Sequence, residues 1–179
     1  MSHDPGGKTR LRLPEGVTGD AAFSPCGRYR HALRRDWTAA GAAPRAILFV
    51  GLNPSVADAD ASDPTCHREL TFARDWGYSR YLKGNLLDWR ATSPRDIPSD
   101  PDRARSPENM DWLRRMAEEA ETLVMASGNV HPRFAGIEAE TIALLRATAK
   151  PVMCLGRNLS GAAKHPLYLR KDARLLPFD

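Results

Sequence analysis

Apolar residues in this chain gather in short runs that are separated by polar and glycine-containing segments. Four segments are strand candidates, at 46–50, 81–89, 122–126 and 151–155, and the run at 46–50 is continuously apolar with no alternation. Such runs are typical of strands that are covered on both faces. Between them, apolar side chains recur at helical spacing in 63–77, 106–120 and 137–148. The pattern therefore predicts an α/β three-layer sandwich, with a mostly parallel, four-stranded central sheet between layers of helices.

The N-terminal part of the chain has a different pattern. Residues 1–20 are rich in glycine, proline and charge, which predicts a loose arm with at most one short strand at 9–13. The segments 21–23 and 28–37 flank Ser24-Pro25-Cys26-Gly27, which has the composition of a type I turn. We therefore expect an N-terminal β-hairpin that opens a single domain spanning 21–179.

Composition narrows the class of protein. The chain has 179 residues, of which 42% are hydrophobic and 27% charged, a profile typical of one globular domain. Its apolar runs are far shorter than the roughly 20 residues of a membrane span, and no signal peptide is evident, so we expect a cytoplasmic protein. The three cysteines have no disulfide, zinc or cluster spacing. We therefore expect no metal and no cofactor.

Positive charge is concentrated near both ends of the chain. Residues 8–45 contain eight Lys/Arg against three acidic residues, although the formal net charge of the whole chain is only +4. A second basic group lies at 157–174 and consists of Arg157, Lys164, Arg170, Lys171 and Arg174. These groups would attract a polyanion, and a solvated basic surface without a partner is the alternative.

The segment after the first apolar run is the first candidate site. In an open α/β sheet, ligands gather at the carboxyl ends of the strands. Gly51-Leu52-Asn53-Pro54-Ser55 follows the run at 46–50, where Gly51 permits a sharp turn and Pro54 fixes the direction of the chain. The amide of Asn53 could orient a water molecule or the polar edge of a ligand. An ordinary Asn-Pro turn is the alternative.

Two further segments offer polar groups at strand ends. Asn85 lies inside an apolar run, where its amide needs hydrogen-bond partners from a ligand or from a backbone edge. Arg90 ends the same run and suits either a phosphate or an ion pair that braces the loop. His165-Pro166 follows the loop 156–164, and its imidazole could donate a hydrogen bond to a leaving group that gains negative charge.

Together these segments resemble the motifs of the uracil-DNA glycosylase superfamily. Gly51 to Ser55 is similar to its G-x-[DEN]-P-[GSY] motif, and Asn85 to Arg90 to the N-x-x-x-x-R-P-P stretch of its thermostable branch. His165 to Arg170 resembles its H-P-x-x-x-x-R motif, with the arginine one place early. The chain also resembles a bacterial family marked by FSPCGxYR, LNPS, DPT, WRATSP and HPLYL segments.

The resemblance implies a glycosylase-like fold and hydrolysis of the N-glycosidic bond of a flipped, modified or unmodified pyrimidine. Asn53 and His165 would be catalytic, positioning water and stabilising the departing base. Base-binding residues would be Gly51, Pro54, Ser55 and Asn85. Phosphate contacts would come from Arg90, Arg157, Lys164 and Arg170. The implied partner is DNA, with RNA or a nucleotide as alternatives, and a monomer is favoured.

The sequence also departs from that superfamily. Asn53 replaces a carboxylate, so the first motif has no evident general base and catalysis should be slow. Three aromatic residues are candidates for stacking on the base, namely Phe72, Trp76 and Tyr168. Two other functions stay open: a nucleobase-binding or nucleotide-binding protein that does not cleave its ligand, and an enzyme that acts on a free nucleotide or a tRNA base.

Overall fold

The structure, a computed structural model, describes residues 9–179 and contains nine strands, four α-helices and three short 3-10 helices in that range. The strands are β1 (Leu11–Arg12), β2 (Thr18–Phe23), β3 (Arg30–Asp36), β4 (Ala46–Gly51), β5 (Ala61–Ser62), β6 (Arg80–Asn85), β7 (Thr122–Met125), β8 (Val152–Cys154) and β9 (Leu176–Pro177). The helices are α1 (Pro64–Asp75), η1 (Pro94–Asp96), α2 (Pro101–Ala104), α3 (Asn109–Glu119), η2 (Pro132–Phe134), α4 (Ala135–Ala147) and η3 (Pro166–Tyr168).

The main sheet has seven strands in the order β2-β3-β6-β4-β7-β8-β9, and β1 pairs with β5 in a separate two-stranded sheet. In the main sheet, β4 is parallel to β6 and β7, and β7 is parallel to β8. The pairs β2-β3, β3-β6 and β8-β9 are antiparallel. The expectation of a four-stranded, mostly parallel, glycosylase-like sheet is therefore wrong, because the sheet is larger and mixed.

The physical reason lies at the two edges that a four-stranded sheet would leave unpaired. Unpaired strand edges expose rows of backbone donors and acceptors, which proteins cover. Here β3 of the N-terminal hairpin covers β6, with Leu33 opposite Lys83, and β9 covers β8, with Leu176 opposite Cys154. The hairpin is thus part of the main sheet and not an addition beside it.

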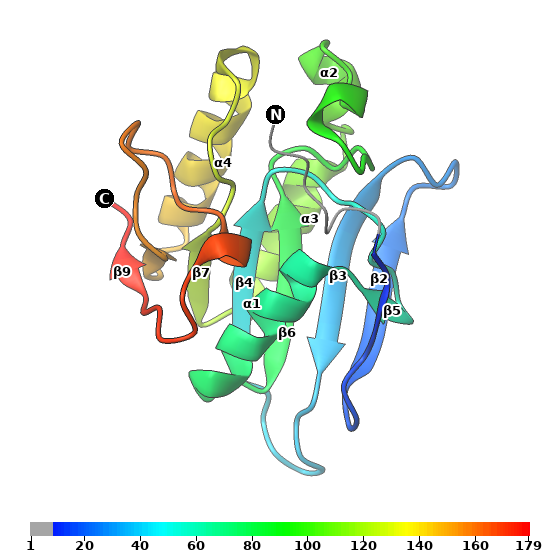
Figure 1. Ribbon diagram of the computed structural model, residues 1–179, viewed down its shortest axis with the longest axis vertical. Coiled ribbons are helices and arrows are strands. Elements are labelled where there is room, and N and C mark those ends of the chain that lie inside the picture. Colours follow the sequence, from blue (N-terminus) through cyan, green and yellow to red (C-terminus); the bar gives the residue numbers. More distant parts are fainter. Residues whose placement is uncertain (1–8) are drawn as a thin grey trace.

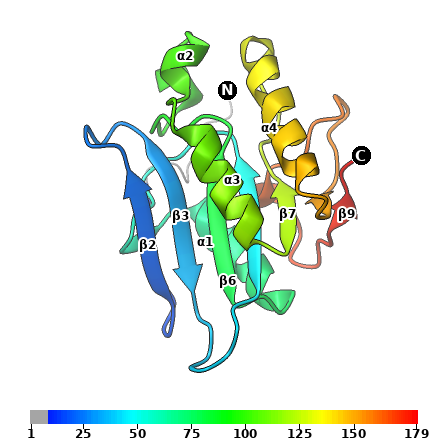
Figure 2. The same cartoon turned by 180° about the vertical axis from the view of Figure 1, so that it is seen from behind.

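Helices cover both faces of the main sheet. Figures 1 and 2 show α1 on one face and α3 with α4 on the other. The strand β4 at the centre is fully buried, and separate apolar clusters fill the space on its two sides. Helix α1 begins where the sequence predicts, because Asp63 accepts the amide of Cys66 at 2.8 Å and Pro64 occupies the first turn.

The predicted N-terminal arm falls only partly within the residues that the structure describes. Residues 1–8 of the predicted arm 1–20 lie outside the described residues, whereas β1 and the start of β2 fall within it. Between residues 9 and 179, no helix combines the length and the apolar character needed to cross a membrane.

Candidate functional site

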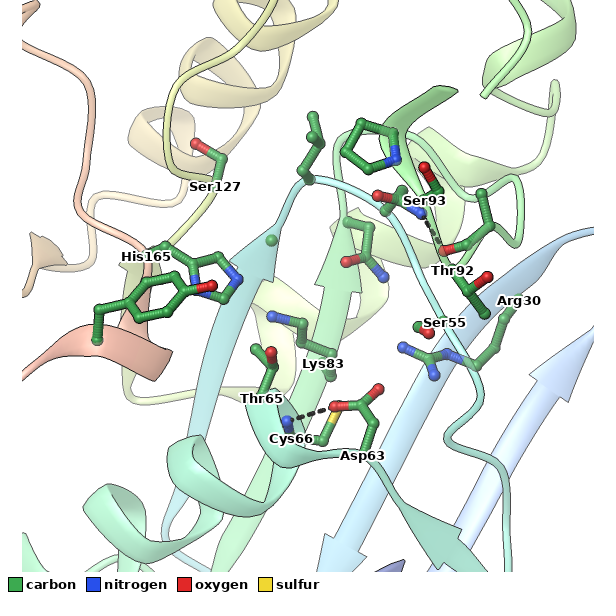
Figure 3. A pocket seen from close by; sticks show the side chains of 17 residues that line it. Arg30, Ser55, Asp63, Thr65, Cys66, Lys83, Thr92, Ser93, Ser127 and His165 are labelled. Carbon is green, nitrogen blue, oxygen red and sulfur yellow. Dashed lines mark hydrogen bonds between the residues drawn. The ribbon is translucent and has the colours of Figure 1, made fainter. Parts of the chain in front are cut away.

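A cavity of about 200 Å³ lies at the carboxyl ends of β4 and β6, beside the segment that follows β7. It brings together five of the predicted site residues: Gly51, Asn53, Ser55, Asn85 and His165. Pro54 is buried in the same loop but does not line the cavity. Residues separated by more than a hundred positions therefore meet in one hollow (Figure 3).

The floor of the cavity is built on β6. Tyr81, Lys83 and Asn85 alternate along this strand, so their side chains lie on one face, toward α1. Gly51 of β4 lies opposite Asn85 in the parallel register. A Cβ atom at position 51 would lie 2.6 Å from Lys83 Nζ and 2.9 Å from Asn85 Oδ1. Glycine at this position therefore makes room for both side chains.

A buried charge pair supports the floor. Lys83 Nζ donates to Glu69 Oε1 at 2.7 Å, and the Tyr81 hydroxyl donates to Glu69 Oε2 at 2.6 Å. Lys83 is 4% exposed and Glu69 is fully buried. Burial raises the pKa of Tyr81 well above its usual value, so this phenol remains a hydrogen-bond donor. The arrangement holds a lysine cation at the floor with donors left for a ligand.

Asn85 has the most unusual environment in the site. It is 1% exposed, and neither its side-chain nitrogen nor its side-chain oxygen has a hydrogen-bond partner. Asn109 of α3 donates its side-chain amide to the backbone carbonyls of Asn85 and Leu86, both at 3.1 Å, which fixes this end of β6. A buried amide without partners costs about 1–3 kcal/mol. A ligand that offers one donor and one acceptor would recover that energy.

Asn53 is held by its own loop and by the next one. Its Nδ2 donates to the carbonyl oxygens of Pro54 and Ala91, both at 3.0 Å. The backbone of Ala91 in turn donates to Pro54 O at 2.9 Å, so the loops after β4 and β6 are joined. With both amide protons engaged, the side-chain oxygen of Asn53 is the atom that can accept a hydrogen bond from water.

His165 and Tyr168 form the opposite wall, on the segment that leads into η3. Leu167 N donates to His165 Nδ1 at 3.3 Å. A neutral imidazole that accepts at Nδ1 carries its proton on Nε2, so this ring can donate a hydrogen bond. The rings of His165 and Tyr168 are 5.9 Å apart, and Tyr168 is 69% exposed at the rim.

Only one of the three candidate stacking aromatics reaches the cavity. Tyr168 lines it. Phe72 and Trp76 stack on each other in α1 at 5.2 Å, and Trp76 also stacks on Phe49 at 6.2 Å, so these two rings belong to the core.

The predicted phosphate contacts lie elsewhere, and none of the four lines the cavity. Arg90 donates to Gly27 O at 3.0 Å and lies over the ring of Phe23. Arg157 donates to backbone carbonyls of Gly161 and Asp179, and Arg170 pairs with Asp172 at 3.1 Å. Lys164 is exposed on the loop before His165. Arg90 and Arg157 therefore brace the chain in this structure.

Sequence reasoning missed two buried cations of the site. Lys83 and Arg30 both line the cavity, and Arg30 is 1% exposed at the start of β3. Lys83 had a signal, because a lysine inside an apolar run, two positions from Asn85, is expected to have a buried partner. Arg30 had none, because its place depends on the hairpin joining β6.

Burial also decides the state of the cavity's thiol. Cys66 lines the cavity at the start of α1, and burial raises its pKa to about 12, so the thiol stays neutral even at alkaline pH below that value. Within residues 9–179, no group of His, Cys, Asp and Glu side chains is arranged to hold a metal ion. The cavity therefore offers hydrogen-bonding groups, the cations Lys83 and Arg30, and the carboxylate of Asp63.

Comparison with known proteins identifies one family. Residues 30–167 match the family described as "Protein of unknown function (DUF1643)". No curated protein and no solved structure matches the chain. The matched range begins at Arg30 and includes every residue that lines the cavity except Tyr168.

Proposed function

The chain belongs to the DUF1643 family, and we propose that its cavity binds a nucleobase, a pyrimidine by preference, and that the protein hydrolyses the N-glycosidic bond of that base. The observation that carries the proposal is Asn85, whose buried amide offers an unused donor beside an unused acceptor. The edge of a uracil or thymine ring presents the complementary acceptor and donor.

The size of the cavity supports a small, flat ligand. Its volume of about 200 Å³ is below the range of about 300–1,000 Å³ typical of sites for drug-sized molecules. Asn85 and Lys83 would contact the base from the floor, and Tyr168 is placed at the rim to cover a ring face. Hydroxyl groups of Ser55, Thr92 and Ser93 complete the lining.

The proposed reaction needs water and no cofactor. The oxygen of a water molecule held by Asn53 Oδ1 attacks the anomeric carbon of the sugar, and the bond from that carbon to the base nitrogen breaks. The electron pair leaves with the base, where Lys83 and the Nε2 proton of His165 stabilise the negative charge. The water proton passes to solvent or to the departing base. Asn53 cannot take this proton, so hydrolysis should be slow.

The bonding of Asn53 favours a second function, in which the protein binds its ligand without cleaving it. Both amide protons of Asn53 brace the loops. The carboxylate that lines the cavity, Asp63, caps helix α1 through its Oδ1. A protein that binds a nucleobase or nucleotide without cleaving it would need no proton-accepting group. The cavity would then act through Asn85 and Lys83 alone.

Base release distinguishes the two functions. The protein is incubated with oligonucleotides that contain uracil, hydroxymethyluracil, hypoxanthine or a thymine mismatch, and abasic sites are scored after alkaline cleavage. We expect release of a pyrimidine that is strongly reduced in Asn53→Ala and His165→Ala. His131→Ala is the matched control, because His131 lies outside the cavity.

The outcomes are separable when binding is measured on the same substrates. Binding without release, abolished by Asn85→Leu, would favour the second function. Release that persists in both Asn53→Ala and His165→Ala would remove these residues from the mechanism.

A further inference from the structure

The Arg30 side of the cavity carries a buried cation that the proposed base chemistry does not use. Arg30 NH1 donates to Ala57 O at 2.8 Å, and its Nε is buried without a partner. Among the described residues, no carboxylate forms an ion pair with it. A buried guanidinium without an anionic partner is unfavourable unless hydrogen bonds or a ligand compensate it.

Arg35 on the same strand shows how such a residue is compensated when its role is structural. It is fully buried and donates to three backbone carbonyls, of Arg34, Asp58 and Ala61. Its Nε, like that of Arg30, is buried without a partner, so the two residues differ in their terminal nitrogens. Arg35 does not line the cavity. Arg30 makes a single such bond and does line it, so Arg30 retains donors for an occupant.

The surroundings of Arg30 suit an anion that also accepts hydrogen bonds. Figure 3 shows Arg30, Ser55 and Asp63 on one side of the cavity and His165 on the other. Thr92 and the first turn of α1, which carries the partial positive charge of a helix N-terminus, line the same cavity. Asp63 opposes this charge only in part, because its Oδ1 caps the helix by accepting the amide of Cys66.

A second hollow adjoins the cavity on this side. This more open hollow of about 420 Å³ shares Ser55, Ala91 and Thr92 with the cavity. Its other walls include Arg28, Trp89 and Arg90. A ligand with its base on Asn85 could therefore continue past Ser55 and Thr92 into the second hollow. Arg30 lines the cavity and not the second hollow, so a phosphate bound to it would lie on the cavity side of Ser55 and Thr92.

We propose that Arg30, with Ser55 and Thr92, forms a subsite for a phosphate group of the nucleotide whose base occupies the cavity. Arginine binds phosphate through paired donors, and hydroxyl groups add further ones. The identity of the base rests on the proposed function, whereas affinity for phosphate does not. The phosphate belongs either to a free nucleotide or to a nucleic-acid strand.

Calorimetric titration tests the subsite with four probes: uridine, uridine monophosphate, inorganic phosphate and a uridine-containing trinucleotide. For the wild type, we expect the monophosphate to bind about 10–100 times more tightly than uridine, the gain expected from hydrogen bonds to a charged group. In Arg30→Met this ratio should fall toward one while uridine affinity is kept. Arg34→Met, on the same strand but exposed and paired with Glu119, is the control and should leave the ratio unchanged.

If Arg30→Met does not fold, Thr92→Val serves as a second test of the subsite. It should lower the affinity ratio of uridine monophosphate to uridine several-fold. Equal affinity of the wild type for uridine and its monophosphate would overturn the subsite and leave the proposed function standing. Phosphate binding that requires Arg30, without any binding of uridine, would support the subsite and overturn the proposed function. A trinucleotide that binds more tightly than the monophosphate assigns the phosphate to a strand, and equal affinity assigns it to a free nucleotide.

Discussion

The floor and the His165 wall of the cavity are built in opposite ways. The floor is formed by Lys83 and Asn85 on a central strand, is buried, and is backed by Glu69 and Asn109. The wall lies on an irregular segment, 156–168, which is partly exposed and contains the 3-10 helix η3. Buried polar groups on a strand have no freedom to rearrange, whereas a surface segment can adjust. We infer that the floor decides what binds and that the wall affects how fast it reacts.

The largest expected effect is on the floor's charge pair. Lys83→Met leaves Glu69 buried without its cation, so we expect a loss of about 3–5 kcal/mol in the free energy of unfolding. Urea denaturation measures this loss. Arg114→Met removes a cation from an exposed pair with Asp111 and should cost less than about 1 kcal/mol. Equal losses in the two variants would mean that the floor is not a coupled buried pair.

Gly51→Ala tests the space that the floor needs. The added methyl group meets Lys83 Nζ and Asn85 Oδ1 at distances below 3.0 Å, so both side chains must move. We expect nucleobase affinity to fall about tenfold or more, since one hydrogen bond to a charged group is worth about 1.5–3 kcal/mol. Gly136→Ala is the control, because a Cβ atom there meets no other atom. Unchanged affinity in Gly51→Ala would separate the floor from the binding site.

On the wall, function and stability should separate. His165→Ala should slow base release about 100-fold, the scale typical of losing one donor to developing charge. Its free energy of unfolding should change by about 1 kcal/mol or less, the scale of losing the one cap bond that His165 accepts from Leu167. Single-turnover release and urea denaturation are measured on His165→Ala and on His131→Ala. A marked loss of stability in His165→Ala alone would give this residue a structural role instead.

The effect that is smallest at neutral pH concerns the buried thiol of Cys66, because it develops only above pH 9. Cys66 has a folded-state pKa of about 12, raised from 9.0 by burial. Unfolded chains lose this proton above pH 9 while folded chains retain it, so the thiol's contribution to stability is present below pH 9 and is lost as the pH rises toward 12. The slope is about 1.4 kcal/mol per pH unit. Cys66→Ala should remove this part of the alkaline slope, and Cys26→Ala, at an exposed site, should not.

The sequence predicts the gathering of Gly51, Asn53, Asn85 and His165 because each follows or ends a segment at one edge of the sheet. The positions of strands and helices along the chain are also predicted, because hydrophobic periodicity is a local property of the sequence. The strand count fails because pairing between β3 and β6 is a long-range contact that periodicity does not encode. Arg30 reaches the cavity only through that pairing.

The basic residues illustrate a second limit of the sequence. The resemblance implies phosphate contacts for Arg90 and Arg157, yet both have protein partners in this structure. Whether an arginine braces the chain or keeps its donors for a ligand depends on which carbonyls and rings the fold brings within reach. Charge alone carries no such information.

The most direct test of the central claim is calorimetric titration of free uracil into the wild type and into Asn85→Leu. Leucine has a similar shape but lacks the amide, so uracil affinity should fall about 10–100-fold, the value of one or two lost hydrogen bonds. The free energy of unfolding should stay equal or rise, since a buried amide without partners has been removed. Unchanged uracil affinity in Asn85→Leu, or no nucleobase binding by the wild type, would contradict the claim that this amide recognises a base.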